Sequence, residues 1–133
     1  MAGESCDPTP DSRFGALANL LAASIAHEPR EVAAFAYCTP GGQVLGTLRI
    51  VSPCSGSLDL PVRRILADAL LLDAPRVMMA HNHPLGEAWP SRADRETTGR
   101  LARAFETIES RLVDHVVVGR SGAMWSFRAA GLL

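Results

Sequence analysis

The most informative segment of the chain is RVMMAHNHPLGEAWPSRAD, residues 76–94. The run after Arg76 is short and without polar interruption, which predicts a strand covered on both faces. Side chains two residues apart on a strand point to the same side, so His81 and His83 are expected to face one point. Pro84 ends the strand because it has no N–H to donate to a neighbour. The sequence therefore predicts two imidazoles held together at the end of a buried strand.

The second part of the stretch supplies a carboxylate. Ser91 and Asp94 fit the first turn of a helix, where the helix dipole favours an acidic side chain. This spacing also fits an ordinary capping box, and the two interpretations are compatible. A His pair alone is more often structural than ligating, but the strand end and the nearby acid together favour a metal site. Two imidazoles and a carboxylate suit Zn²⁺ and leave a fourth position for water, so we predict one zinc ion per chain on His81, His83 and Asp94.

A general base is also expected, because metal-bound water must lose a proton as it attacks and none of the three ligands is free to accept it. Glu31 is the candidate. It stands directly before the first expected strand, where a carboxylate is held more firmly than in a loop. The alternative, a solvated charge at the strand end, is left open by the sequence.

The segments around this stretch alternate between helical and strand-like patterns. Expected helices carry apolar residues at steps of three and four, and expected strands are short apolar runs bounded by Gly or Pro. The expected elements are a helix from Ser12 to Ile25, strands 32–39 and 43–51, a helix capped by Asp59 over 62–72, a strand at 76–80, a helix from Ser91 to Leu112, and strands 113–118 and 124–127. The order is helix, two strands, helix, strand, helix, two strands.

The length of 133 residues fits one domain and is too short for a TIM barrel of about 250 residues. Residues 1–12 contain two prolines, two aspartates and two serines without apolar periodicity, which predicts a flexible lead-in. A single domain is expected over residues 13–133.

The charged residues exclude one class of chemistry. All 13 basic residues are Arg, so no lysine amine is present for Schiff-base or nucleophilic catalysis. The net charge of −1 gives no overall attraction to a polyanion, so nucleic-acid binding would need a local patch.

The three cysteines and the N-terminal sequence indicate a cytoplasmic protein. Cys6, Cys38 and Cys54 match neither a disulfide framework nor a Cys-x-x-Cys metal knuckle. The first residues are acidic rather than basic, and the longest apolar stretch is interrupted by polar residues, so neither a secretory signal nor a membrane span is expected.

Other metal-binding patterns with His-x-His fit less well. Metallo-β-lactamase-like sites place Asp and His shortly after the pair, where this chain has Leu85 and Gly86. Amidohydrolases need a barrel that 133 residues cannot form, and zinc deaminases need a Pro-Cys-x-x-Cys segment that is absent. A His-Asn-His nuclease remains an alternative interpretation, which rests on these three residues alone.

Several residues receive structural interpretations or stay open. His27 and His115 are interpreted as structural. Cys38 is expected to be a small buried residue, because no sequence feature would activate its thiol. Trp89 is either packed on its own turn or in contact with substrate.

The order Glu31, His81-x-His83, seven residues, Ser91-x-x-Asp94 resembles the complete pattern of the JAMM (MPN-plus) metalloprotease family. The RadC-like branch is indicated by four further segments: His-Asn-His-Pro at 81–84, Pro-Ser-Arg-x-Asp at 90–94, Leu-x-Asp-His-Val-Val-Val-Gly at 112–119, and Ser-Phe-Arg at 126–128 with Gly131-Leu. The resemblance covers residues 28–133.

This resemblance implies both a fold and residue roles. The expected fold class is α/β, a mixed sheet flanked by helices, similar to the cytidine deaminase arrangement. His81, His83 and Asp94 would bind zinc, Glu31 would act as general base, and the Ser91 hydroxyl would stabilise the oxyanion.

The implied function is hydrolysis of an amide, peptide or isopeptide bond in a protein or peptide-like substrate by zinc-activated water, with an association with DNA repair suggested by the family name. The alternatives are a non-catalytic metal-binding interaction domain working with DNA-repair proteins, and a metal-dependent nuclease. Family members commonly have Ser where this chain has Leu85, and usually carry an N-terminal helix-hairpin-helix region that we expect to be missing here. Direct nucleic-acid binding is therefore not expected. Membrane association is not expected either, because no long uninterrupted apolar stretch is present, and the oligomeric state is left open.

Overall fold

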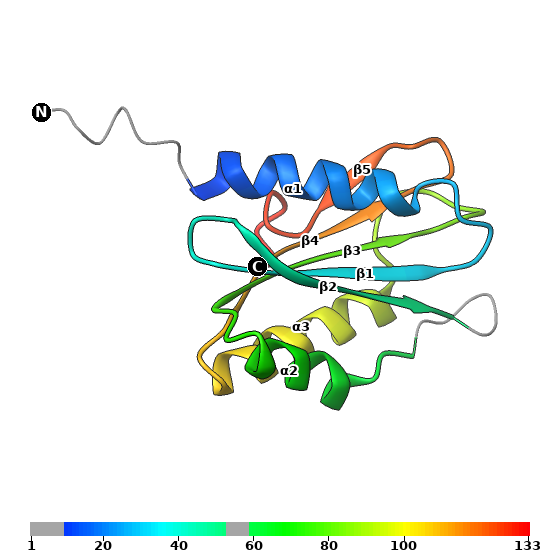
Figure 1. The fold of residues 1–133 in the computed structure, drawn as a ribbon. Coiled ribbons are helices and arrows are strands. Elements are labelled where there is room, and N and C mark those ends of the chain that lie inside the picture. Colours follow the sequence, from blue (N-terminus) through cyan, green and yellow to red (C-terminus); the bar gives the residue numbers. More distant parts are fainter. Residues whose placement is uncertain (1–9, 53–58) are drawn as a thin grey trace, which may run out of the picture.

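The computed structural model describes residues 10–52 and 59–133, which form three layers with a sheet between helices (Figure 1). The helix α1 (Pro10–Ile25) covers one face of the sheet, and α2 (Val62–Leu71) and α3 (Arg92–Thr107) cover the other. The strands are β1 (Val32–Cys38), β2 (Val44–Val51), β3 (Arg76–Asn82), β4 (Arg111–Val118) and β5 (Met124–Ser126). The α/β class predicted from the sequence is confirmed.

The sheet has the strand order β2-β1-β3-β4-β5 and is mixed, as predicted. β3 is parallel to β4 and antiparallel to β1, while the hairpins β1–β2 and β4–β5 are antiparallel. A parallel neighbour requires a crossover connection, and α3 provides it between β3 and β4. The loop from β3 to α3 therefore starts at the end of the central strand.

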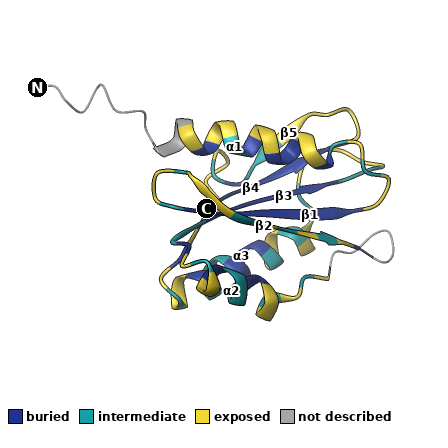
Figure 2. Cartoon of the chain, viewed as in Figure 1, coloured by how far each residue is buried: buried dark blue, intermediate teal, exposed yellow. Residues whose placement is uncertain are grey.

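The core lies on both sides of the two central strands. All residues of β1 are buried, and in β3 only Arg76 is partly exposed. Alternate side chains of these strands pack against α1 on one face and against α2 and α3 on the other. In Figure 2 the central strands are dark blue and the outer surfaces of the helices are yellow. The uninterrupted apolar run after Arg76 predicted correctly that β3 is covered on both faces.

The first helix begins earlier than expected. Residues 10–12 were predicted to belong to a flexible lead-in over 1–12, but α1 begins at Pro10. Proline is accepted in a first helical turn because the missing N–H would have no partner there. The remainder of the expected lead-in, residues 1–9, lies outside the described residues.

Two other helix limits differ from the sequence prediction. α2 begins at Val62 after Pro61 and has no side-chain cap, so the predicted capping role of Asp59 is wrong. α3 ends at Thr107, and Leu112 belongs to β4 rather than to this helix. Leu112 fits helical spacing equally well, but the left-handed backbone of Glu109, with φ of 60°, separates the two elements.

The pairing of β3 with β4 contains a bulge. Val77 pairs with Leu112 and Met78 with Asp114, so Val113 is an extra residue in β4. A bulge reverses which face the following side chains occupy. It therefore changes the direction of every β4 side chain after Val113.

None of the helices within residues 10–52 and 59–133 has the length and apolar character needed to cross a membrane. The longest, α1 and α3, have 16 residues each, whereas a spanning helix needs about 20 predominantly apolar residues.

We predict that Gly119→Ala lowers the free energy of unfolding by about 1–3 kcal/mol, because the added methyl group meets backbone that cannot move freely. A Cβ at this position would lie 2.8 Å from the Ala88 nitrogen and 3.0 Å from the Gly86 oxygen. Urea denaturation measures the change. Gly15→Ala is the matched control: nothing lies within 4 Å of its Cβ in an exposed helix position, so it should stabilise the protein by up to about 1 kcal/mol. An unchanged stability of Gly119→Ala would contradict this close packing.

Candidate metal centre

Four side chains from three parts of the chain meet at the end of β3. Glu31 precedes β1, His81 lies in β3, His83 follows it, and Asp94 lies in the first turn of α3. One potential ligand atom from each lies within 4.8 Å of the others, and we call these residues the four-residue cluster. The structure thus brings together the three predicted ligands and the predicted base, while their roles stay predictions.

The N-terminus of α3 fixes Asp94. Ser91 Oγ accepts a hydrogen bond from the Asp94 backbone N–H at 3.0 Å, and Asp94 Oδ2 accepts one from the Ser91 N–H at 2.8 Å. This is the capping box that the sequence allowed, and the same Oδ2 atom also points to the imidazoles. Ser91 therefore lies beside the cluster, and its hydroxyl hydrogen remains able to donate because Oγ acts as the acceptor in the cap.

Asn82, between the two histidines, positions the segment that carries Glu31. Its Oδ1 accepts from the Val32 N–H at 2.6 Å, and its Nδ2 donates to the carbonyls of Glu28 and Arg30 at 3.1 and 3.0 Å. Glu31 lies within this clamped segment, and its Oε1 is 4.0 Å from His81 Nε2. The sequence interpretation assigned no role to Asn82, because nothing in the pattern shows which distant backbone groups an amide will reach.

The distances among three of these side chains match tetrahedral coordination. His81 Nε2 and His83 Nε2 are 2.9 Å apart, and Asp94 Oδ2 lies 3.4 and 3.0 Å from them. Ligands at zinc-type bond lengths of 2.0–2.1 Å stand about 3.3 Å apart in a tetrahedron. The three atoms could therefore bind one divalent ion with little movement.

The hydrogen bonding of His83 leaves its lone pair toward this point. Its Nδ1 is 2.8 Å from the Glu87 carbonyl oxygen, which can only accept, so the neutral ring carries its hydrogen on Nδ1. Nε2 then faces a second imidazole nitrogen and a carboxylate oxygen. Such a convergence of acceptors is stable only with a proton or a metal ion between them. The donor set therefore fits a metal ion.

The electrostatics of the site show the competition between proton and metal. Burial favours the neutral form of Asp94, but contacts with His81, His83 and the Ser91 N–H outweigh it and hold the pKa of this carboxyl well below its usual range. The hydrogen bond that His83 donates to the Asp94 carboxylate raises the pKa of His83, against the opposing effect of burial. A proton on His83 thus competes with a cation for Nε2.

His115 and Thr98 lie directly behind His81, and the sequence interpretation missed this contact. His115 Nε2 is 2.6 Å from His81 Nδ1, and His115 Nδ1 is 2.7 Å from Thr98 Oγ1. Burial, with a further effect of His81, holds the pKa of His115 well below its ordinary value, so the ring is neutral. His115 had been interpreted as a structural residue.

Comparison with known proteins places the chain in a family. Residues 12–132 match the family model of the RadC-like JAB domain. The chain belongs to this family. The resemblance seen in its motifs is thereby confirmed. The RadC-like JAB domain is also similar to a UPF0758 protein of Vibrio cholerae, with 46% identity over 66 residues. That match covers 50% of this chain and 42% of the relative, so the chain corresponds to only part of the relative's length.

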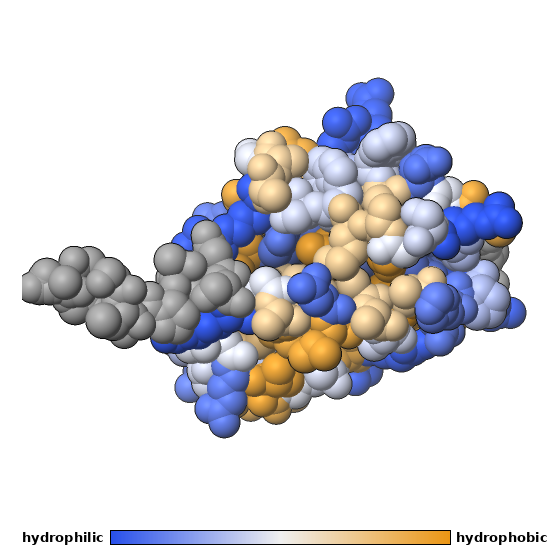
Figure 3. All heavy atoms as spheres, turned by 90° about the horizontal axis from the view of Figure 1, so that it is seen from above, coloured by the Kyte–Doolittle hydropathy of each residue, from blue (hydrophilic) through white to orange (hydrophobic). Residues whose placement is uncertain are grey.

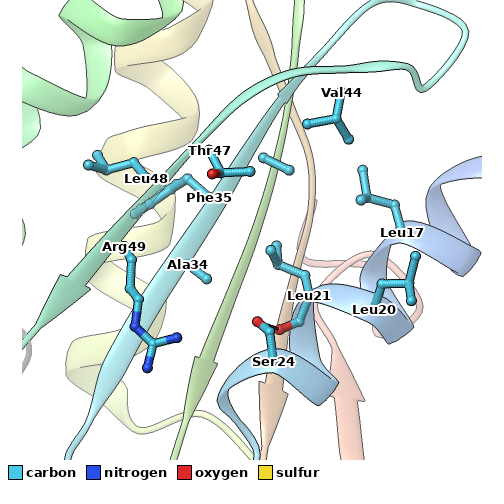
Figure 4. A pocket seen from close by; sticks show the side chains of 11 residues that line it. Leu17, Leu20, Leu21, Ser24, Ala34, Phe35, Val44, Thr47, Leu48 and Arg49 are labelled. Atoms are coloured by element: carbon cyan, nitrogen blue, oxygen red, sulfur yellow. Dashed lines mark hydrogen bonds between the residues drawn. The ribbon is translucent and has the colours of Figure 1, made fainter.

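A mostly apolar groove of the RadC-like JAB domain lies between α1 and β2, separate from the four-residue cluster (Figure 4). It is lined by Leu17, Leu20, Leu21, Ser24, Ala34, Phe35, Ala36, Val44, Thr47, Leu48 and Arg49. Seen from the α1 side, apolar side chains gather within a rim of hydrophilic ones (Figure 3). None of the cluster residues lines this groove.

We predict that purified protein contains about one divalent metal ion per chain, and that His83→Ala or Asp94→Ala loses it, because each removes one of three converging ligands. Elemental analysis after desalting measures the content. His27→Ala, at an exposed position outside the cluster, is the matched control and should retain the metal. Full metal content in both ligand variants would contradict the assigned ligands.

We also predict that metal affinity falls as the pH is lowered. A proton on His83 occupies the nitrogen that binds the ion, and the hydrogen bond to Asp94 raises the pKa of this imidazole. Below that pKa each displaced proton reduces the apparent affinity by about tenfold per pH unit. Chelator competition at a series of pH values measures the slope. A flat profile between about pH 8 and 5 would contradict proton–metal competition at His83.

Proposed function

We propose that this RadC-like JAB domain is a zinc-dependent metallohydrolase that cleaves an amide, peptide or isopeptide bond. The observation that carries the proposal is the placement of Glu31 beside the three converging ligand atoms rather than among them. Its carboxylate oxygen is 4.0 Å from His81 Nε2, whereas the ligand atoms are 2.9–3.4 Å apart. A structural metal site would close its coordination with a fourth protein ligand as near as the other three, whereas Glu31 stands farther off, where a general base for metal-bound water would lie.

Zinc is the metal that the donor set favours, since two imidazoles and one carboxylate with an open position are typical of catalytic zinc sites. A zinc ion bound there would acidify a water molecule and polarise the carbonyl of the scissile bond. The protein supplies the remaining chemistry. Glu31 accepts the proton of the attacking water and delivers it to the leaving amine nitrogen, so that acid and amine are released.

Ser91 supports the proposal as an oxyanion donor. Its Oγ is held by the Asp94 N–H, so the hydroxyl is anchored next to a ligand and can donate its own hydrogen. A donor fixed before the reaction stabilises the developing negative charge without having to reorganise. In the proposed reaction Ser91 donates to the carbonyl oxygen as it becomes negative.

A cysteine mechanism is a poor alternative among the described residues. Cys38 is buried, as the sequence predicted, and burial raises the pKa of its thiol to about 11. A thiol with such a pKa is protonated at neutral pH and is a weak nucleophile. This leaves water activated at the four-residue cluster as the better supported nucleophile. Cys6 and Cys54 lie outside the described residues.

The substrate side of the proposal rests on the loop between the ligands. Leu85 and Trp89 lie in it with exposed fractions of 83% and 63%. Exposed apolar side chains beside a site can contact a protein or peptide-like substrate. We propose that the substrate is a protein or a peptide-like molecule. We further propose that the protein is cytoplasmic, and that its association with DNA repair does not involve direct nucleic-acid binding by this domain.

We predict that Glu31→Gln keeps the metal but lowers turnover by at least about 10²-fold, because the amide cannot accept the proton. A cleavage screen with peptide, isopeptide-linked and plasmid substrates compares the variant with wild type. Glu28→Gln is the matched control: this residue pairs with Arg49 and is not part of the cluster, so activity should remain.

Each other outcome of the screen points away from the proposal. Cleavage of plasmid without cleavage of peptides would identify a nuclease. Full peptide cleavage by Glu31→Gln would remove the assigned base. Metal binding with no cleavage of any substrate would favour a non-catalytic interaction domain.

A further inference from the structure

Two buried residues behind the metal centre form a continuous polar chain with His81. Thr98 on α3, His115 on β4 and His81 on β3 are each 1% exposed. Thr98 Oγ1 is 2.7 Å from His115 Nδ1, and His115 Nε2 is 2.6 Å from His81 Nδ1. This series of hydrogen bonds runs from the backbone carbonyl of Asp94, through the side chains of Thr98 and His115, to the ring of His81.

Only one placement of hydrogens satisfies this chain with neutral rings. The Thr98 hydroxyl donates to the Asp94 carbonyl at 2.7 Å, because a carbonyl can only accept. Its oxygen must then accept from His115, which places that hydrogen on Nδ1 and leaves Nε2 as an acceptor. His81 consequently donates from Nδ1, and its Nε2 carries the lone pair. That lone pair points to His83 and Asp94, where a metal ion would bind.

We propose that Thr98 and His115 are positioning residues that hold His81 in the tautomer that binds metal. The proposal rests on the metal centre of the proposed function but concerns metal affinity rather than hydrolysis. Groups that fix the ring and tautomer of a ligating histidine typically contribute a factor of about 10 to 100 in metal affinity. In many metal sites a carboxylate or backbone carbonyl accepts the remaining ring hydrogen of a ligating histidine. Here the acceptor is the neutral imidazole of His115, which is itself held by the Thr98 hydroxyl.

The bulge in β4 is what aims His115 at His81. Residues Leu112 and Val113 belong to opposite faces of the sheet, and the extra residue changes the phase of the side chains that follow. Asp114 holds this irregular segment, since its carboxylate accepts hydrogen bonds from the backbone N–H groups of His115 and Arg128 and from the Ser126 hydroxyl. If β4 paired with β3 in regular register, without the bulge, His115 would lie opposite Ala80 and face α1 instead of α3.

A role in packing alone does not account for the choice of histidine. The His115 ring stacks on Phe127 with centroids 4.6 Å apart and planes at 2°, and phenylalanine could make the same contact. A buried imidazole is costly unless both nitrogens are bonded. Both are bonded here, and one of the partners is a ligand of the cluster.

Two matched pairs of variants test the proposal. Thr98→Val removes the hydroxyl with little change of shape, whereas Thr98→Ser keeps it. His115→Phe keeps the ring stack but removes the acceptor for His81, whereas His115→Gln offers an amide oxygen in its place. Thr107→Val is the control on the same helix, because it removes a similar hydroxyl-to-carbonyl bond, to Ala104, about 20 Å from the N-terminus of α3.

The first measurement is the zinc dissociation constant by chelator competition. Thr98→Val and His115→Phe should bind zinc about 10- to 100-fold more weakly. Thr98→Ser and His115→Gln should recover most of this loss, and Thr107→Val should match wild type. Wild-type affinity in both Thr98→Val and His115→Phe would overturn the proposal. So would equal losses in Thr98→Val and Thr98→Ser, because these would point to a general effect on α3.

The second measurement needs no metal and no substrate. Imidazole ¹⁵N–¹H correlation spectra of metal-free protein at about pH 8, where ordinary imidazoles are neutral, report which nitrogen of His81 carries hydrogen. The wild type should show it on Nδ1, and Thr98→Val should shift part of the population to Nε2. Hydrogen on Nε2 in the wild type would overturn the proposal. If His81 of the wild type carries its hydrogen on Nδ1 and the protein binds zinc but cleaves no substrate, only the hydrolase function would be contradicted.

Discussion

The three hydrogen bonds of the Asn82 side chain are the interaction on which the site depends. They attach the segment before β1 to the end of β3, across about fifty residues of sequence. Because strand side chains alternate, Asn82 can reach this segment while His81 and His83 point to the opposite side. One strand end therefore presents two imidazoles and also holds the backbone that carries Glu31. One more residue between His81 and His83 would turn one imidazole away from the other, because strand side chains alternate between the two faces.

The sheet and α3 together determine how closely the side chains of the four-residue cluster approach one another. β3 lies at the centre of the sheet with β1 and β4 on either side, so its end cannot shift independently. The parallel neighbour β4 requires a crossover, and the first turn of the crossover helix brings Asp94 to the two histidines. The capping box then uses one carboxylate oxygen both to begin the helix and to face the cluster. The hydrogen bond that caps the start of α3 thus also holds the Asp94 carboxylate at the cluster.

The loop between His83 and Ser91 is fixed although it is exposed. Its start is held by the His83 N–H, which donates to the Val118 carbonyl at 2.8 Å, and its middle by the Arg120 N–H, which donates to the Gly86 carbonyl at 2.8 Å. The close approach of Gly119 to the same loop leaves no space for a side chain. Its exposed apolar residues therefore lie on an anchored backbone. This would favour binding of the proposed substrate, because the loop would lose little conformational freedom.

Sequence patterns correctly predict the local parts of this protein, namely the His81-x-His83 pair at a strand end and the Ser91-x-x-Asp94 turn, and also its family. These depend on spacing within one strand or one helical turn, where the geometry is set by the backbone. The contact between His115 and His81 could not be predicted, since alternation predicts a side-chain direction only when no bulge intervenes, and a bulge depends on how two distant strands pair. The partners of Asn82 were likewise invisible, because an amide side chain carries no information on which remote carbonyls it will reach.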